Sequence, residues 1–356
     1  MAARSKPSPK RIVYLWGAGA TQAEAQHLGA TISLLMPDTD AFGDGIATRI
    51  LGRMGRSVTS SFSSEHGVDI EKLISLLAAS GIEEHSCLAD KMRQAYFTEL
   101  KVSLANAGVL ENPSLAIDLF DMHSNRKFRE EVETLSGIIT TNHDGLLQVA
   151  SQNVFGKVNL GFEFSSAAFS EVISNAVPPI LQLHGSFTWR FGTPMRVRKL
   201  RKQSAYTDTV WIPPTILKES KIYPFNKLSG LAYELLARHC DLLRVVGASL
   251  TQNDWNILSL IFNAQRHREY TNGTAFLIDL IMPHESGMRI AEECAYLKYI
   301  KPIGYLTEGQ FAAYKDSSVE PKPGMENPFA YWLMEKKAFH RSLGEWTDVG
   351  VDEAAA

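Results

Sequence analysis

The sequence predicts an α/β fold: a Rossmann-like parallel sheet with helices on both faces, plus a helical insertion. Three observations predict it. Short apolar runs alternate with segments of helical periodicity, an order typical of a parallel sheet covered on both sides. Several of these runs end in small or polar residues, as strands do beside a ligand site. The chain has 356 residues, 45% hydrophobic and 21% charged, which suits one large globular domain with an inserted subdomain.

The elements follow from the spacing of apolar residues. Short apolar runs predict strands at 12–16, 137–141, 157–162, 180–183, 242–246 and 275–280. Apolar residues three and four apart predict helices at 69–77, 88–107, 126–135, from 146 onward, and at 225–239, 254–267 and 286–297. The segment 188–212 is polar and predicts an insertion or a hairpin, and 22–66 is expected to be irregular with short helices.

The chain divides into three parts. Residues 1–10 are a basic, proline-containing lead-in that we expect to be flexible. Residues 11–315 form the α/β domain, with the helical insertion at about 60–135. Residues 316–356 form a C-terminal extension, rich in proline and aromatic residues, that we expect to be an extended arm docked on the body or on a partner.

Composition excludes several classes of protein. The net charge is −3, so no overall field draws the chain to nucleic acid or to a membrane. No apolar run approaches the length that spans a bilayer, and the N-terminus lacks the apolar core of a secretory signal. The three cysteines, Cys87, Cys240 and Cys294, lie far apart and cannot build a four-cysteine zinc site. We therefore expect a cytoplasmic protein without structural zinc.

The first motif is Gly17-Ala18-Gly19, which follows the apolar run 12–16. Glycines after a buried strand let the backbone approach a pyrophosphate, and the N-terminus of the next helix favours its negative charge. The full GxGxxG fingerprint is absent because position 22 is Gln. A tight turn without a ligand is the alternative interpretation.

A second motif is Thr140-Thr141-Asn142-His143-Asp144-Gly145 at the end of another predicted strand. The carboxyl ends of parallel strands are where α/β sheets bind ligands. Asn142 can donate and accept, so it can hold a ribose hydroxyl or orient a water molecule. Asp144 can support such a site or cap the following helix.

Three further strand ends carry candidate residues. His184 follows Leu181-Gln182-Leu183, where an imidazole could act as a general base near neutral pH; a satisfied core histidine is the alternative. Gly247-Ala248-Ser249 forms a second small-residue turn that permits close approach to a phosphate or ribose. Asp279 is expected to end the strand 275–280, where its carboxylate could accept from adenosine hydroxyls or cap a helix.

Taken in this order, the motifs resemble the sirtuin family, in which the corresponding motifs surround one NAD molecule. The resemblance covers the sheet elements from about 12 to 300, is loose over 22–135 and does not reach the tail. It implies that the pyrophosphate and the adenosine side of NAD are held by Gly17, Ala18, Gly19, Ala20, Thr21, Gly247, Ala248, Ser249 and Asp279.

The resemblance also implies the catalytic residues. Asn142 would contact the nicotinamide ribose or position water, and His184 would be the catalytic histidine. Asp144 would support this pocket, together with Thr141, which stands where sirtuins have the Gln of Thr-Gln-Asn.

Two departures narrow the function. The chain cannot form the four-cysteine zinc ribbon of sirtuin deacetylases, and Pro37-Asp38 is only a distant match to their Gly-Ile-Pro-Asp-Phe-Arg stretch. These departures are similar to the zinc-free sirtuin-like proteins of bacterial antiviral defence, which hydrolyse NAD to nicotinamide and ADP-ribose. The resemblance implies an NAD hydrolase that works as a homo-oligomer or with a partner such as a ring-forming ATPase or a prokaryotic Argonaute.

Four alternatives stay open from the residues alone. An NAD-dependent protein deacylase would use the same NAD residues plus an acyl-lysine groove. A non-catalytic NAD or ADP-ribose sensor would bind without turnover. A hydride-transfer dehydrogenase would want GxGxxG and an acidic residue about 20 positions on. The basic stretch 190–202 could contact nucleic acid, although such a run is more often a solvated hairpin, so we do not expect direct nucleic-acid binding.

Overall fold

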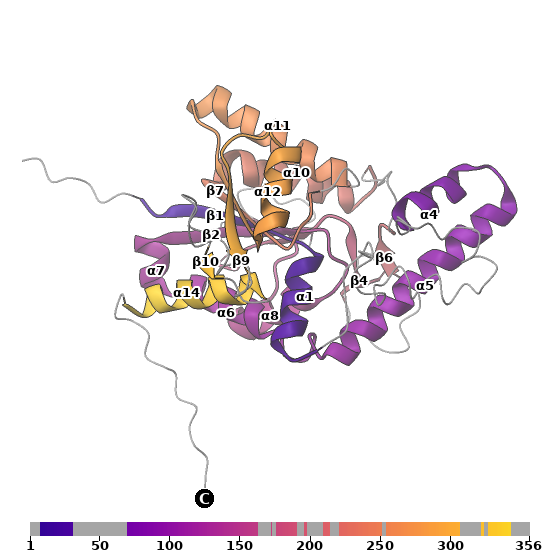
Figure 1. Cartoon of the computed structure of the whole chain (residues 1–356), viewed down its shortest axis with the longest axis horizontal. Coiled ribbons are helices and arrows are strands. Elements are labelled where there is room, and N and C mark those ends of the chain that lie inside the picture. The colour runs from indigo at the N-terminus through magenta and orange to yellow at the C-terminus, as the bar shows by residue number, and fades with distance from the viewer. Residues whose placement is uncertain are drawn as a thin grey trace, which may run out of the picture.

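A parallel sheet forms the centre of the molecule (Figure 1). The structure is a computed structural model that describes residues 8–30, 70–162, 172, 176–190, 196–197, 209–213, 221–250, 254–306, 322–323 and 327–342. Over these residues the sheet has seven strands in the order β10-β9-β8-β7-β1-β2-β3, and every neighbouring pair is parallel. The predicted Rossmann-like α/β fold is confirmed.

The strand order locates the point where such a sheet binds ligands. The strands are β1 (Lys10–Trp16), β2 (Glu133–Thr140), β3 (Ile180–Gln182), β7 (Leu242–Val246), β8 (Leu277–Pro283), β9 (Ile300–Leu306) and β10 (Lys322–Pro323). Counting the first six in chain order gives the spatial order 3-2-1-4-5-6, which is that of dinucleotide-binding Rossmann folds. The order reverses between β1 and β7, so the loops after these two strands flank the switch point.

Helices cover both faces of the sheet (Figure 1). On one face lie α10 (Phe225–His239), α11 (Trp255–Asn272) and α12 (His284–Glu293). On the other lie α1 (Ala18–His27), α6 (Ser114–Ser124), α8 (Leu146–Phe155) and α14 (Pro328–Ser342), with α7 (Arg126–Glu131) leading into β2. The prediction of two covered faces is therefore confirmed, and the predicted bounds of α10 and β7 agree with the structure.

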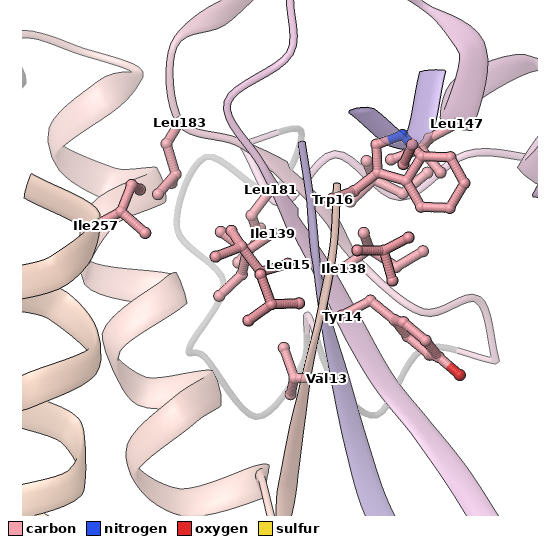
Figure 2. Packing of buried hydrophobic residues seen from close by; sticks show 14 of the residues in the cluster. Val13, Tyr14, Leu15, Trp16, Ile138, Ile139, Leu147, Leu181, Leu183 and Ile257 are labelled. Atoms are coloured by element: carbon pink, nitrogen blue, oxygen red, sulfur yellow. The ribbon is translucent and has the colours of Figure 1, made fainter. Parts of the chain in front are cut away.

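The alternation of side chains along β1 explains its continuous apolar run. Val13 and Leu15 lie on the side of the sheet that also holds Ile257 of α11, and Tyr14 and Trp16 lie on the opposite side (Figure 2). All four β1 residues are buried. A central strand of a parallel sheet has no solvent face, so both sets of alternating positions must be apolar or fully hydrogen-bonded.

The helical insertion is a hairpin of α4 (Ile70–Ala79) and α5 (Glu83–Ala107), which extends from the body beside the small second sheet (Figure 1). α5 begins five residues earlier than predicted. It ends at Gly108, whose φ of +66° gives the left-handed cap that glycine favours.

The predicted hairpin at 188–212 is part of an antiparallel sheet. Over the described positions its strands are β4 (Gly185–Arg190), β5 (Arg196–Val197) and β6 (Thr209–Trp211), in the order β5-β4-β6. The rest of the basic stretch 190–202 lies outside the described residues, as do Pro37-Asp38 and most of the segment 22–66.

Three predicted elements are corrected by the structure. The helix expected at 126–135 ends at Glu131, and β2 begins at Glu133 because that carboxylate pairs with a strand residue across the sheet. The strand expected at 157–162 is reduced to one bridge between Asn159 and Pro179. The last predicted strand runs to Pro283 instead of 280, because the buried residues continue past Asp279.

The described part of the C-terminal extension is β10 and α14, where an extended arm was expected. Phe329 and Trp332 are one helical turn apart and face the sheet, and their rings approach Trp16 and Tyr14 at 5.2 and 6.2 Å. This spacing places the apolar side chains on one side of the helix. Among the described helices none is long and apolar enough to cross a membrane.

Candidate functional site

Two glycine-containing loops meet at the switch point. The Gly17 N–H donates to the Val246 carbonyl at 2.9 Å, and the Gly19 N–H donates to the Gly247 carbonyl at 2.8 Å. A Cβ on Gly17 would lie 2.4 Å from Ala248 Cα, and one on Gly247 would lie 2.1 Å from the Ala20 nitrogen. Gly247 also has a φ of +60°. Glycine is required in both loops because their backbones touch.

This contact gives the glycines a different role from the one predicted, because they allow the two loops to touch each other. The space beside Gly17 and Gly19 is filled by the loop after β7, so a ligand would lie over the joined loops, where Ala18, Ala248 and Ser249 are partly or fully exposed. Gly17 is the N-cap of α1 and provides no side-chain cap. With no acidic residue in its first turn, the start of α1 favours an anion.

Asn142 ties the end of β2 to the first of these loops. Its Nδ2 group donates to the Gly17 carbonyl at 3.0 Å and to Thr21 Oγ1 at 2.9 Å. Its own backbone N–H donates to Thr140 Oγ1 at 3.0 Å, and that hydroxyl donates to the Trp16 carbonyl at 2.7 Å. The amide orientation is therefore set by the protein, with Oδ1 as the atom that can accept from a ligand hydroxyl or water.

Asp144 and Thr21 form the buried base of the site. The Thr21 hydroxyl donates to Asp144 Oδ2 at 2.9 Å, and the Leu146 N–H at the start of α8 donates to Oδ1 at 3.1 Å. The helix-capping alternative for Asp144 thus fits its contacts. Burial raises the pKa of Asp144, and these hydrogen bonds oppose the rise. Thr21 is also buried, so its hydroxyl faces the interior, away from the position expected for a pyrophosphate.

A network that the sequence did not reveal holds the Asn142 loop. Gln182 Nε2 donates to the carbonyls of Asp144 at 2.9 Å and Asn142 at 3.3 Å. Ser186 Oγ donates to the His143 carbonyl at 3.2 Å. The only local signal was a glutamine inside a buried apolar strand. Burying an amide costs free energy unless it is hydrogen-bonded, so such a residue points to a fixed loop nearby.

His184 lies at the same edge of the sheet as Asn142. The register pairs Thr140 with Gln182, and Asn142 and His184 each follow two residues later. His184 is buried, and its carbonyl accepts from the Ile212 N–H at 2.7 Å. The residue lines a pocket of about 710 Å³ on the face of the sheet covered by α10 and α11.

His143 connects this edge to the helical insertion. Its ring stacks on Phe187 with centroids 5.4 Å apart and meets Tyr96 of α5 at 6.0 Å and Trp211 of β6 at 5.0 Å. Its centroid is 6.2 Å from that of His184. His143 stands between Asn142 and Asp144 in the chain, so these ring contacts join their loop to α5.

Asp279 does not join these residues. It faces Arg244 in the register, two residues before the pair Val246–Ile281, so it lies within β8 and not at its carboxyl end. The expectation that Asp279 ends a strand is wrong, because Leu280 and Ile281 continue the buried run. Burial raises the pKa of Asp279, and the charge of Arg244 opposes the rise.

A buried charge cluster lies beside Asp279, beneath α14. Arg244 donates to both carboxylate oxygens of Glu133, at 2.7 and 2.5 Å, and to the Tyr14 hydroxyl at 3.0 Å. Lys336 of α14 donates to Glu133 at 3.2 Å. Burial alone would raise the pKa of Glu133, but the hydrogen bonds and charge of Arg244 lower it to about 2. The cluster joins β1, β2, β7 and α14.

Over the described ranges, no three His, Cys, Asp or Glu residues gather in a group that could hold a metal ion. A scan of the chain against models of known protein families found no match, and a search of curated proteins found no similar protein.

Proposed function

We propose that the chain is an NAD glycohydrolase that converts NAD and water into nicotinamide, ADP-ribose and a proton. One observation carries the proposal. Asn142 donates from a single amide to the Gly17 carbonyl and to Thr21, beside the point where the strand order reverses. Sheets with this strand order bind dinucleotides at that point. A polar side chain held rigidly there is suited to act on the ribose of the bound cofactor.

Binding would use the joined loops. The N-terminus of α1 favours the pyrophosphate, and the exposed Ser249 can donate to a phosphate or ribose oxygen. The hydrogen bond between the Gly19 N–H and the Gly247 carbonyl joins the two loops and supports a preorganised surface. Preorganisation of this kind lowers the entropic cost of binding.

The reaction breaks the bond between ribose C1′ and the nicotinamide nitrogen. Nicotinamide leaves as a neutral ring with the bonding electrons, so C1′ gains oxocarbenium character, as in glycoside cleavage. Asn142 Oδ1 accepts from a ribose hydroxyl or from the attacking water. His184 accepts the proton that the water loses as it bonds to C1′. Gln182 and Asp144 act as positioning residues that keep the Asn142 loop in place.

The biological setting follows the resemblance to zinc-free sirtuin-like proteins. We propose a cytoplasmic effector subunit of an antiviral complex that depletes NAD, active as a homo-oligomer or with a partner ATPase or Argonaute-type protein. The contact between Tyr96 of α5 and His143 supports control by assembly, since it links the helical insertion to the Asn142 loop.

The test compares Asn142→Ala and His184→Ala with the unaltered protein. Nicotinamide and ADP-ribose are followed by chromatography, with and without candidate partners. Each substitution is expected to lower turnover by ~100- to 10,000-fold, the usual cost of losing a general base or a group that acts with one. His27→Ala, at an exposed site on α1, is the matched control and should leave turnover unchanged.

Other results would replace the proposal. Near-normal turnover in both variants would refute the assigned roles. Nicotinamide release that requires an acylated peptide would identify a deacylase instead. Saturable NAD binding without turnover, under every condition that assembles the protein, would identify a sensor.

A further inference from the structure

The pocket beside His184 extends well beyond the catalytic edge. It is lined by Leu183, His184 and Ile212 and by residues of α10 and α11. The α11 residues that line it extend from Trp255 to Tyr270, about 22 Å of helix at 1.5 Å per residue. No described residue of the Gly17 loop or the Gly247 loop lines it. A volume of about 710 Å³ is that of a small-molecule site.

Aromatic residues are among those that line this pocket, and two of them are largely exposed to solvent. Trp255 is 65% exposed and Tyr270 is 93% exposed, and Tyr233 of α10 stands opposite, its ring 6.0 Å from His267. Large aromatic side chains are usually buried to a high degree. Rings that face a pocket provide flat surfaces on which a nucleobase can stack.

The charge of the lining favours an anion. Among the described lining residues none is a carboxylate, and the basic ones are His184, Arg266 and His267. Arg266 pairs with Glu269 at 3.1 Å, but Glu269 also pairs with Lys298, so the three side chains together carry one positive charge. A guanidinium in this position is suited to bind a phosphate.

Polar groups complete the chemistry of a nucleotide site. Asn256, Ser259 and Asn263 lie along the same face of α11, between the ring of Trp255 and the guanidinium of Arg266. Amides and hydroxyls can bind ribose hydroxyls and base edges as donors or acceptors. A stacking surface, hydrogen-bonding groups and a cation thus follow one another along the helix.

We infer that the pocket between α10 and α11 binds a purine nucleoside phosphate, with the base against its aromatic rings and the phosphate at Arg266. The inference does not depend on the proposed hydrolysis, because it concerns binding along α11 and not at the loops after β1 and β7. Two sources share this chemistry: a separate nucleotide, and the ADP part of NAD or ADP-ribose, whose binding here would replace the binding at the joined loops proposed above. Either ligand would lie beside His184. NAD bound there would be the substrate, and a separate nucleotide could regulate the reaction.

The test is titration calorimetry of the full chain with ADP and with ADP-ribose as probes. Arg266→Ala and Trp255→Ala are expected to raise the Kd at least about tenfold, as the loss of a charge-assisted hydrogen bond or of a stacking surface does. Both positions are exposed, so neither substitution removes core packing. Arg289→Ala, at an exposed position on α12, is the matched control and should keep the Kd of the unaltered protein.

The outcomes are separable. A Kd weakened in both pocket variants but not in Arg289→Ala supports the site. If the variants also raise the Kd for NAD, the ligand is the substrate; if they leave that Kd unchanged, it is a separate nucleotide. Absence of saturable binding, variants that bind as tightly as the unaltered protein, or tight binding only to single-stranded oligonucleotides would overturn the inference. None of these binding results requires that NAD be hydrolysed.

Discussion

Replacing Gly247 by alanine tests whether the two loops at the switch point must touch. Gly247 has a φ of +60°, and a Cβ there would lie 2.1 Å from the Ala20 nitrogen and 2.4 Å from the Gly19 carbonyl carbon. The neighbouring atoms are backbone of α1, which is held by the hydrogen bond between the Gly19 N–H and the Gly247 carbonyl. They cannot rotate away as a side chain would, so the loops must separate.

The expected loss of stability has two parts. A residue with a Cβ in the left-handed region costs ~1 to 2 kcal/mol. Forcing extra volume into a packed site costs a further ~1 to 3 kcal/mol. Gly273 offers a matched control, because its φ is +75° and a Cβ there would meet no atom within 4 Å. Gly273→Ala should therefore show only the first part, and Gly247→Ala both, or ~2 to 5 kcal/mol.

Urea unfolding followed by circular dichroism measures both variants. The difference between them isolates the close approach, since the backbone conformations are similar. Equal losses in Gly247→Ala and Gly273→Ala would refute the conclusion that the loops touch. Under the proposed function, Gly247→Ala should also lower NAD hydrolysis at temperatures where the variant is fully folded, and Gly273→Ala should not.

Two further predictions concern buried polar groups. The pKa of Glu133 is lowered to about 2, so its ion pair stabilises the fold fully above pH 4.5 and is lost as the pH falls toward 2, a change of ~3 kcal/mol in unfolding free energy. In urea unfolding, Glu133→Gln should abolish the fall of the unfolding free energy at acidic pH. It should also cost ~3 to 5 kcal/mol at neutral pH, because Arg244 stays buried without its charged partner. An unchanged pH dependence would show that other carboxylates cause it. Gln182→Leu removes the donors to the Asn142 loop and should cost ~1 to 3 kcal/mol, with a larger fall in kcat than in thermal stability; normal kcat would exclude a positioning role.

The local pattern predicted the sheet well where burial is continuous. Residues 12–16 and 242–246 are buried along their whole length, and each becomes a central parallel strand. Helix α10 was predicted with its observed bounds because its apolar residues recur at helical spacing next to polar ones. In these segments local periodicity and tertiary burial agree, so the sequence is sufficient to predict the secondary structure.

The prediction was wrong where a polar residue lies inside a strand. Asp279 suggested a strand end, but it is accommodated because Arg244 lies opposite it on β7. Glu133 was likewise assigned to a helix, because its charge is typical of a solvated helix face and its partner, Arg244, is 111 residues away in the chain. A charge that is compensated by a distant residue carries no local sign of that compensation.

The candidate site was predicted in part. The order of the motifs identified Asn142, the glycine loops and His184 as neighbours at one edge of the sheet, and strand register agrees with that placement. Their contacts were not predictable. Thr21 is directed into the protein by Asp144, and Gln182 supports the loop from the next strand.

The sequence by itself determined the α/β class, the strands of the sheet core and the motifs at their carboxyl ends, because each depends on residues close together in the chain. Only the tertiary structure decided which polar groups meet, that the glycines serve contact between two loops, and that α14 closes one face over a buried charge cluster. It also decided that α10 and α11 enclose a pocket beside His184. These features depend on distances between segments up to about 300 residues apart, such as Ala23 and Asn327, which no local pattern encodes.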